Sequence, residues 1–125
     1  MKERRREPRT REENRVVLTI VPGEGEEPRG PYYCLTKDIS VGGIRIMTDA
    51  PLAIGTSVQV EITLARSRKR VLALARVRWA RELFGKDVFD TGLEFLHLDP
   101  ETEVALIEHI YGRRWTKPGP PRPTE

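Results

Sequence analysis

The sequence is poor in the residues on which most catalytic and metal sites depend. It contains one cysteine, Cys34, and two histidines, His97 and His109, among 125 residues. A single cysteine cannot form an internal disulfide, and no Cys or His cluster has the spacing of a zinc site. Ser40 lacks the G-x-S-x-G context of a hydrolase nucleophile. These absences argue against an enzyme, a metal or a cofactor. We expect both histidines to be ordinary surface or boundary residues and Cys34 to be a small strand residue.

Long apolar runs are also missing. No stretch approaches the length of a membrane span, and the charged start Met1-Lys2-Glu3-Arg4 is unlike a secretory signal peptide. A lone cysteine is compatible with a reducing compartment. We therefore expect a soluble protein of the cytoplasm, and 125 residues suffice for one domain with its own core.

Charge is abundant, but its signs nearly cancel, leaving a formal net charge of +3. The imbalance is local, because residues 1–15 carry seven Lys or Arg side chains against four Glu. We interpret residues 1–15 as a flexible basic arm that attracts anions. Residues 115–125 are rich in proline and cannot sustain a helix or a central strand, so we expect a disordered tail there.

The intervening residues 16–114 show repeated strand signals separated by turns. Residues 57–64 alternate apolar and polar side chains strictly, which indicates a half-buried strand. The basic run Arg66-Ser67-Arg68-Lys69-Arg70 is typical of a hairpin tip. Similar β-branched or alternating segments predict strands at residues 16–21, 32–36, 43–48, 57–64, 71–80 and 91–98.

The hydrophobic period changes to that of a helix only near the end of this region. Asp99 is a good N-cap, Pro100 suits the first helical position, and Gly112 is a stop signal. Val104, Ile107 and Tyr111 follow at helical spacing. The pattern therefore predicts an all-β protein: a six-stranded antiparallel barrel with one C-terminal α-helix.

Two short runs carry the chemistry. Asp38-Ile39-Ser40-Val41-Gly42-Gly43 offers a carboxylate, a hydroxyl and two glycines at a strand boundary, and the cluster of residues 4–9 offers several guanidinium groups. Arginine binds phosphate and the guanine edge, and glycines admit a flat ring close to the backbone. The simpler interpretations are a solvated basic tail and a tight turn capped by its own side chains.

The whole chain resembles the PilZ domain family, the bacterial receptors for cyclic di-GMP. Arg5 and Arg9 match the R-x-x-x-R motif of that family, and Asp38, Ser40 and Gly43 match its [DN]-x-S-x-x-G motif. The similarity extends over roughly residues 4–114. It also includes the segments 52–56, 77–79, 92–95 and 99–101.

The resemblance implies a ligand and a set of contacts. Arg5 and Arg9 would grip phosphate and a guanine edge, whereas Asp38 and Ser40 would hydrogen-bond a guanine. Gly42 and Gly43 would let the ring lie close to the turn. Arg4, Arg6 or Trp79 could stack on a base. The implied protein is a non-catalytic cytoplasmic receptor that changes conformation on binding cyclic di-GMP and acts on a downstream protein partner in motility, biofilm or polysaccharide output.

Alternatives remain at three points. Arg11 and Arg15 also satisfy R-x-x-x-R, although Arg15 abuts the first strand. Trp79 is on the same predicted face as core residues of its strand, so it could belong to the core instead of the ligand site. The protein could also be a ligand-independent PilZ-like scaffold that acts through protein contacts. Nucleic-acid binding is less favoured, since the surface beyond the arm is nearly neutral.

Overall fold

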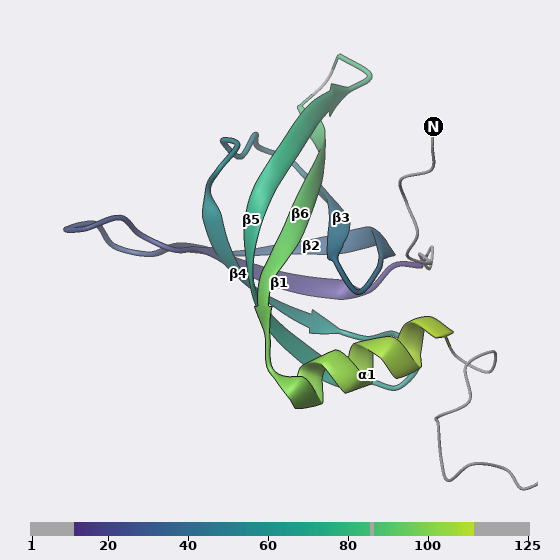
Figure 1. The fold of residues 1–125 in the computed structure, drawn as a ribbon. Coiled ribbons are helices and arrows are strands. Elements are labelled where there is room, and N and C mark those ends of the chain that lie inside the picture. The colour runs from purple at the N-terminus through teal and green to yellow at the C-terminus, as the bar shows by residue number, and fades with distance from the viewer. Residues whose placement is uncertain (1–11, 86, 112–125) are drawn as a thin grey trace, which may run out of the picture.

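Six antiparallel strands close into a barrel in the order β1-β2-β3-β6-β5-β4, and a helix follows them (Figure 1). The computed structural model describes residues 12–85 and 87–111. The predicted fold class is confirmed. The elements are β1 (Arg15–Ile20), β2 (Arg29–Ile39), β3 (Gly43–Thr48), β4 (Ser57–Thr63), β5 (Arg70–Leu83), β6 (Val88–Leu98) and α1 (Pro100–Tyr111).

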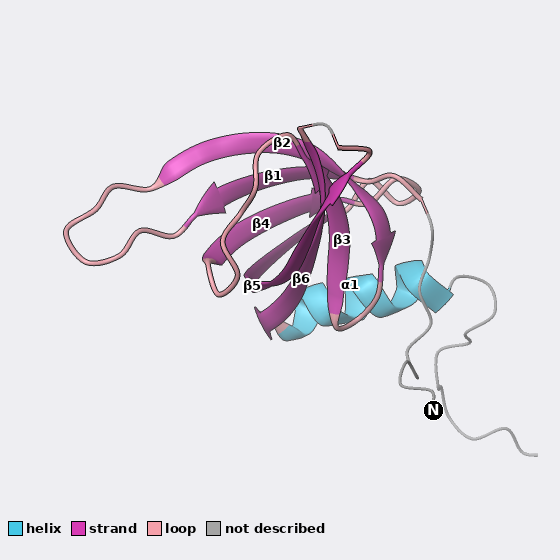
Figure 2. Cartoon of the chain, turned by 90° about the horizontal axis from the view of Figure 1, so that it is seen from above, coloured by secondary structure: helices cyan, strands magenta, loops and turns pink. Residues whose placement is uncertain are grey.

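The barrel interior is filled by the inward-facing side chains of the strands. On β4, Val58, Val60 and Ile62 are almost completely buried, as their alternation with polar residues predicts. Each such side chain stabilises the fold by roughly 1.5–3 kcal/mol through loss of contact with water. The helix α1 lies across one end of the barrel, beside the turn that joins β4 and β5 (Figures 1 and 2).

The face that α1 buries differs from the prediction. Leu106 and His109 are buried and Ile110 is half-buried, whereas Val104 is 51% exposed. Leu106, His109 and Ile110 share one helical face, because His109 and Ile110 follow Leu106 by three and four residues. His109 is therefore not a surface or boundary histidine, and that expectation is wrong. His97 is exposed, as expected.

Three strands are longer than their sequence patterns predict. β2 already begins at Arg29, β5 continues to Leu83, and β6 begins at Val88. Charged residues and prolines weaken the strand signal in these extensions, but pairing with the neighbouring strand holds them extended. As a result the β1–β2 and β5–β6 hairpins project from the barrel in two directions (Figure 1).

The end of the predicted arm is fixed to the barrel. Arg15 is the first residue of β1, and Asn14 is fully buried. Asn14 accepts a hydrogen bond on Oδ1 from the backbone N–H of Ala65 (2.7 Å), and its own backbone N–H donates to Oγ1 of Thr36 (3.0 Å). The last part of the predicted arm, residues 12–14, is therefore a short segment anchored to the barrel, and Arg15 belongs to β1.

Candidate functional site

The turn between β2 and β3 is closed by hydrogen bonds within itself. The backbone N–H of Ser40 donates to the carbonyl of Gly43 (2.9 Å), and the Ser40 hydroxyl accepts from the backbone N–H of Gly42 (3.2 Å). The carbonyl of Gly42 accepts from the backbone N–H of Phe95 on β6 (2.9 Å). Ser40 is completely buried, so its hydroxyl stabilises the shape of the turn.

Gly43 allows β3 and β6 to approach closely at this turn. A Cβ atom at this position would lie 2.1 Å from the backbone carbonyl oxygen of Leu93, which no real side chain can tolerate. The glycine is therefore required for strand packing, whatever binds nearby. The last fixed position of the [DN]-x-S-x-x-G run thus has a structural cause in this chain.

Asp38 belongs to a chain of charges that crosses four strands. Its carboxylate Oδ2 lies 3.0 Å from Nε of Arg45 on β3. The same guanidinium donates to Oδ2 of Asp90 on β6 (3.1 Å), and Arg81 on β5 donates to that oxygen as well (3.1 Å). Asp90 is only 3% exposed, so two cations stabilise a buried carboxylate. Its other oxygen, Oδ1, is buried and makes no hydrogen bond within the described part of the chain.

The side chain of Trp79 lies on the outer surface of the barrel and not in its core. The indole is 40% exposed and packs directly over Gly92, where a Cβ atom would lie 2.2 Å from the indole Nε1. The guanidinium of Arg81 lies 5.8 Å from the centre of the indole ring, within cation–π range. A shift in the β5–β6 register between Val77 and Trp79 is the cause, because an extra residue reverses the alternation. The core alternative for Trp79 is therefore wrong.

Strand pairing joins these residues into one outer row. Asp38 is paired with Arg45, Arg45 with Gly92, and Gly92 with Trp79. Three strand spacings of about 4.8 Å make the path around the barrel from Asp38 to Trp79 roughly 14 Å long. We call this set, Asp38-Arg45-Gly92-Trp79, the cross-strand row. It presents a carboxylate, a guanidinium group and an aromatic face along a row that begins beside the β2–β3 turn, and these groups are suited to binding a flat anionic molecule.

The remaining predicted site residues lie outside the described residues. This applies to the first R-x-x-x-R pair, Arg5 and Arg9, and to Arg4 and Arg6. Arg11 of the alternative pair also lies there, whereas Arg15 is an exposed residue of β1. Of the predicted ligand contacts, the structure therefore brings together Asp38, Ser40, Gly42 and Gly43 and places Trp79 at the far end of the cross-strand row.

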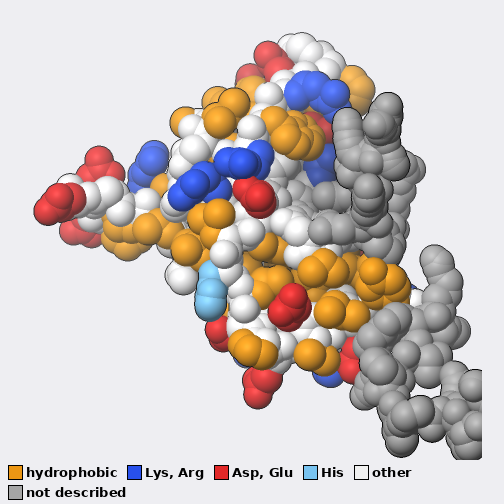
Figure 3. Space-filling view, viewed as in Figure 1, with side chains coloured by type: hydrophobic (Ala, Val, Ile, Leu, Met, Phe, Trp, Pro, Cys, Tyr) orange, Lys and Arg blue, Asp and Glu red, His pale blue; other side chains and the backbone are white. Residues whose placement is uncertain are grey.

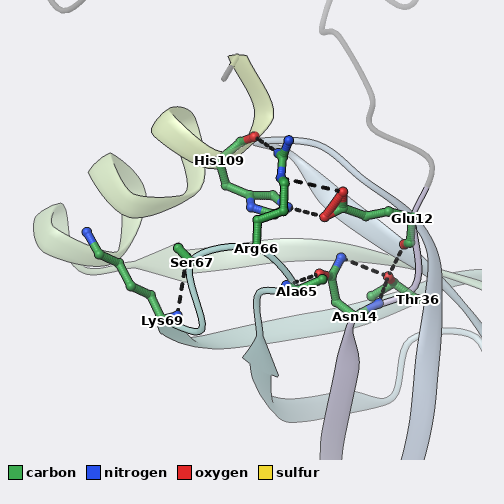
Figure 4. Close-up of polar contacts among 8 residues, drawn as sticks. All are labelled: Glu12, Asn14, Thr36, Ala65, Arg66, Ser67, Lys69 and His109. Atoms are coloured by element: carbon green, nitrogen blue, oxygen red, sulfur yellow. Dashed lines mark hydrogen bonds and ion pairs between the residues drawn. The ribbon is translucent and has the colours of Figure 1, made fainter. Parts of the chain in front are cut away.

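The arm begins beside this site, because the anchored segment 12–14 is bound to β2 near Asp38. The hydroxyl of Thr36 donates to the backbone carbonyl of Glu12 (2.9 Å) and accepts from the side-chain amide of Asn14 (3.1 Å) (Figure 4). Oε2 of Glu12 is 2.5 Å from Nε2 of the buried His109. Arg66 donates to the backbone carbonyl of His109 (2.5 Å), so the exit of the arm, the β4–β5 turn and α1 meet at one point.

The prediction missed Arg45, Arg81 and Asp90. Arg45 stands between the inward-facing Ile44 and Ile46, so its outward orientation was predictable from alternation. The spacing of Trp79 and Arg81 by two residues likewise places both on one strand face. Their convergence on Asp90 was not predictable, because it depends on which strands pair. Within the described residues no group of three His, Cys, Asp or Glu side chains could hold a metal, and no helix is long and apolar enough to cross a membrane.

Comparison with solved structures finds the same fold in several known proteins. The inhibitor of motility MotI/DgrA from Bacillus subtilis superposes with a TM-score of 0.70 at 22% identity, covering 90% of this chain and 52% of that one. The PilZ domain of YcgR from Escherichia coli, solved with c-di-GMP, gives 0.65 at 19% identity, with 90% and 92% covered. The K. pneumonia MrkH–c-di-GMP complex gives 0.62 at 20% identity, with 85% and 50% covered.

This chain spans about half the length of MotI/DgrA and of MrkH. A comparison with curated protein sequences found no match. The family model for the PilZ domain matches residues 3–112, which is most of the chain and includes both motif runs. This protein therefore belongs to the PilZ domain family.

Proposed function

We propose that this protein is a receptor for cyclic di-GMP that binds the dinucleotide across the β2–β3 turn and the cross-strand row. The observation that carries the proposal is the cross-strand row itself, which exposes Trp79 and keeps Asp38 beside the turn. Membership of the PilZ family supports it, as do the c-di-GMP complexes of YcgR and MrkH among proteins of the same fold.

The chemistry of the row matches the chemistry of the ligand. Cyclic di-GMP carries two phosphates and two guanines, so a receptor needs cations, hydrogen-bond acceptors for guanine N–H groups, and stacking surfaces. Asp38 supplies an acceptor, and the exposed face of Trp79 supplies a stacking surface. Arg81, whose side chain is 63% exposed, supplies a cation next to that face. Gly42 and Gly43 keep the turn free of side chains that would hinder a ring.

The arm would complete the site. Glu12 is held beside β2, and an extended chain advances at most about 3.4 Å per residue, so Arg9 stays within roughly 10 Å of that anchor. Arg5 and Arg9 are therefore able to reach a ligand on the turn. In this proposal the arm gains charge-assisted hydrogen bonds only when the phosphates of cyclic di-GMP are present. The ordering of the arm is then the conformational change that reports ligand binding.

The downstream step would be recognition of the ordered arm by a protein partner in motility, biofilm or polysaccharide control, in the cytoplasm. Nucleic acid is a poorer candidate, because Lys or Arg and Asp or Glu side chains are interspersed over β5 and β6 (Figure 3). Arg78, for example, pairs with Glu94 at 2.9 Å. A surface of mixed sign attracts phosphate chains weakly.

A second candidate is a PilZ scaffold that works without the ligand. The hydrogen bonds of Ser40 favour it, because they lie within the turn and leave its hydroxyl completely buried. Asp38 is likewise already paired with Arg45. On this interpretation the [DN]-x-S-x-x-G run shapes the barrel, and protein contacts alone carry the function.

Amide and indole chemical shifts distinguish the two candidates. We expect cyclic di-GMP to shift the backbone amides of residues 40–43, the amide of Gly92 and the indole N–H of Trp79, with GTP as the control ligand. The Trp79→Phe variant identifies the Trp79 indole signal, because the chain has a second tryptophan. Unchanged spectra, or shifts confined to another face of the barrel, would exclude binding at the cross-strand row.

A further inference from the structure

The tip of the β5–β6 hairpin carries an aromatic residue that the fold itself does not use. Phe84 is 81% exposed and has a φ of 59°, in the left-handed region that bulky residues rarely adopt. Asparagine or glycine would suit this position better, and glycine does follow at Gly85 with a φ of 60°. Both the backbone conformation and the exposure of Phe84 to water are therefore unfavourable in the part of the single chain that the structure describes.

The same chain has a pocket that the described residues, 12–85 and 87–111, leave open. It has a volume of about 400 Å³ and lies between β2 and the segment 47–52, at the opposite end of β2 from the turn at residues 38–43. It is thus separate from the proposed ligand site. Its walls are mainly apolar or aromatic and include Leu18, Ile20, Tyr32, Met47, Leu52 and Val88. The volume is in the range of pockets that bind small molecules, so it is large enough to receive one aromatic side chain.

Chemically this pocket suits an aromatic side chain better than a charged or reactive ligand. The Cys34 thiol in its wall has its pKa raised to about 11 by burial and by Asp49, so it stays protonated at neutral pH and acts as an apolar group. Tyr33 at the rim is 77% exposed. An apolar floor with an exposed aromatic rim is the kind of surface that receives an aromatic anchor in protein interfaces.

We propose that the occupant is Phe84 of a second copy of this chain, in a two-fold symmetric dimer. The two features lie close together, since Val88 in the pocket wall is the strand partner of Leu83, the residue before Phe84. In a two-fold interface each surface meets its counterpart reciprocally, so one aromatic residue and one pocket provide two contacts. The charges also suit this arrangement, because Arg29 lies at the pocket and Glu82 lies on the hairpin.

The proposal does not depend on cyclic di-GMP, so it is tested without ligand. Sedimentation velocity over a series of protein concentrations should show a discrete monomer–dimer equilibrium for the full chain. Phe84→Asn should weaken dimerisation by roughly tenfold or more, because each of the two contacts loses its anchor. Leu72→Asn is the matched control, since Leu72 is also an exposed apolar residue (60%) but lies on β5 away from the pocket, and it should dimerise like the wild type.

A loss of folding would not explain weaker dimerisation of Phe84→Asn. Asparagine tolerates a positive φ better than phenylalanine, so Phe84→Asn should have a melting temperature equal to or above that of the wild type. Ala50→Trp tests the other half of the interface, because Ala50 is an exposed residue of the pocket wall and a tryptophan there would fill the pocket from its own chain. It should weaken self-association as Phe84→Asn does.

Mixing the two variants is the most specific test. Phe84→Asn keeps its pocket and Ala50→Trp keeps its Phe84, so a mixed pair regains one of the two contacts. We expect a heterodimer in the mixture that is more stable than either variant homodimer. The proposal is overturned if the wild type is monomeric at every concentration, if it forms open-ended polymers, if Phe84→Asn dimerises like the wild type, or if the mixture shows no gain.

Discussion

Gly43 and Gly92 show how single residues set the geometry of the candidate site. Each lies at a point where a Cβ atom would overlap an existing group, the Leu93 carbonyl in one case and the Trp79 ring in the other. Gly43 lets β3 lie close to β6, and Gly92 lets the indole lie flat on the barrel. The glycines therefore support the ligand site by placing its neighbours, beyond any direct contact with a ligand.

The first prediction follows from Gly43. Gly43→Ala should lower the free energy of unfolding by about 1–3 kcal/mol, the usual cost of overpacking, because the Leu93 backbone cannot withdraw easily. Chemical denaturation of the ligand-free protein measures it. Gly23→Ala is the control, since a Cβ there meets only the flexible Glu26 side chain at 3.4 Å, and its stability should be nearly unchanged. Equal stability of Gly43→Ala and the wild type would contradict the packing argument.

At the scale of elements, the arm and the helix α1 meet at the anchored segment 12–14. Glu12 contacts His109 and Thr36. Arg66 from the β4–β5 turn donates a hydrogen bond to the backbone carbonyl of His109 near the end of α1 (Figure 4). The arm thus leaves the barrel from a fixed point, which separates the roles of its arginines. Arg15 is held within β1, whereas Arg9 precedes the anchor.

The second prediction distinguishes the two R-x-x-x-R pairs. Arg9→Ala should weaken cyclic di-GMP binding by on the order of 2–4 kcal/mol, the scale for truncating one partner of a buried charge pair. Arg15→Ala serves as the matched variant and should lose much less, and neither change should lower the melting temperature of the free protein much. Calorimetric titration of both variants is the measurement. If Arg15→Ala loses as much cyclic di-GMP affinity as Arg9→Ala, or more, then Arg11 and Arg15 are the working R-x-x-x-R pair.

The third prediction concerns His109 and pH. Burial lowers the pKa of His109 below its usual value; Arg66 adds to this, and Glu12 opposes it. The unfolded chain therefore takes up a proton more readily than the native chain as the pH falls from about 7 to about 5, so acidification should reduce stability. In His109→Gln this group no longer titrates, and the decline in unfolding free energy should be shallower. Parallel curves for the two proteins would contradict this assignment.

At the scale of the whole molecule, local patterns predicted the barrel and the helix correctly. Alternation in β4 and the Asp99-Pro100 start of the helix depend only on neighbouring residues, so they were visible in the sequence. The exposure of Trp79 was not, because the irregular pairing of β5 with β6 reverses the alternation after Val77. The burial of His109 and the convergence of Arg45 and Arg81 on Asp90 depend on contacts between distant segments, which no local pattern contains.

The site itself was predicted in part. The motif run Asp38 to Gly43 forms the end of β2 and the turn into β3, and the exposed Trp79 lies at the far end of the cross-strand row. Arg5 and Arg9 lie outside the described residues, so their roles stay predictions. Ser40 and Gly43 each have a structural role in this barrel, so the presence of these two residues alone does not require a ligand.

Binding of cyclic di-GMP through the turn and the cross-strand row is measured by isothermal titration calorimetry of the whole chain at near-physiological salt, with GTP and cyclic GMP as comparison ligands and Asp38→Ala as the site variant. We expect saturable heat with cyclic di-GMP and little with the mononucleotides. Asp38→Ala should bind about tenfold or more weakly while losing only about 0.5–2 kcal/mol of unfolding free energy. Absence of heat from cyclic di-GMP up to high micromolar concentration would show that the protein is not a receptor for it and would favour the ligand-independent scaffold.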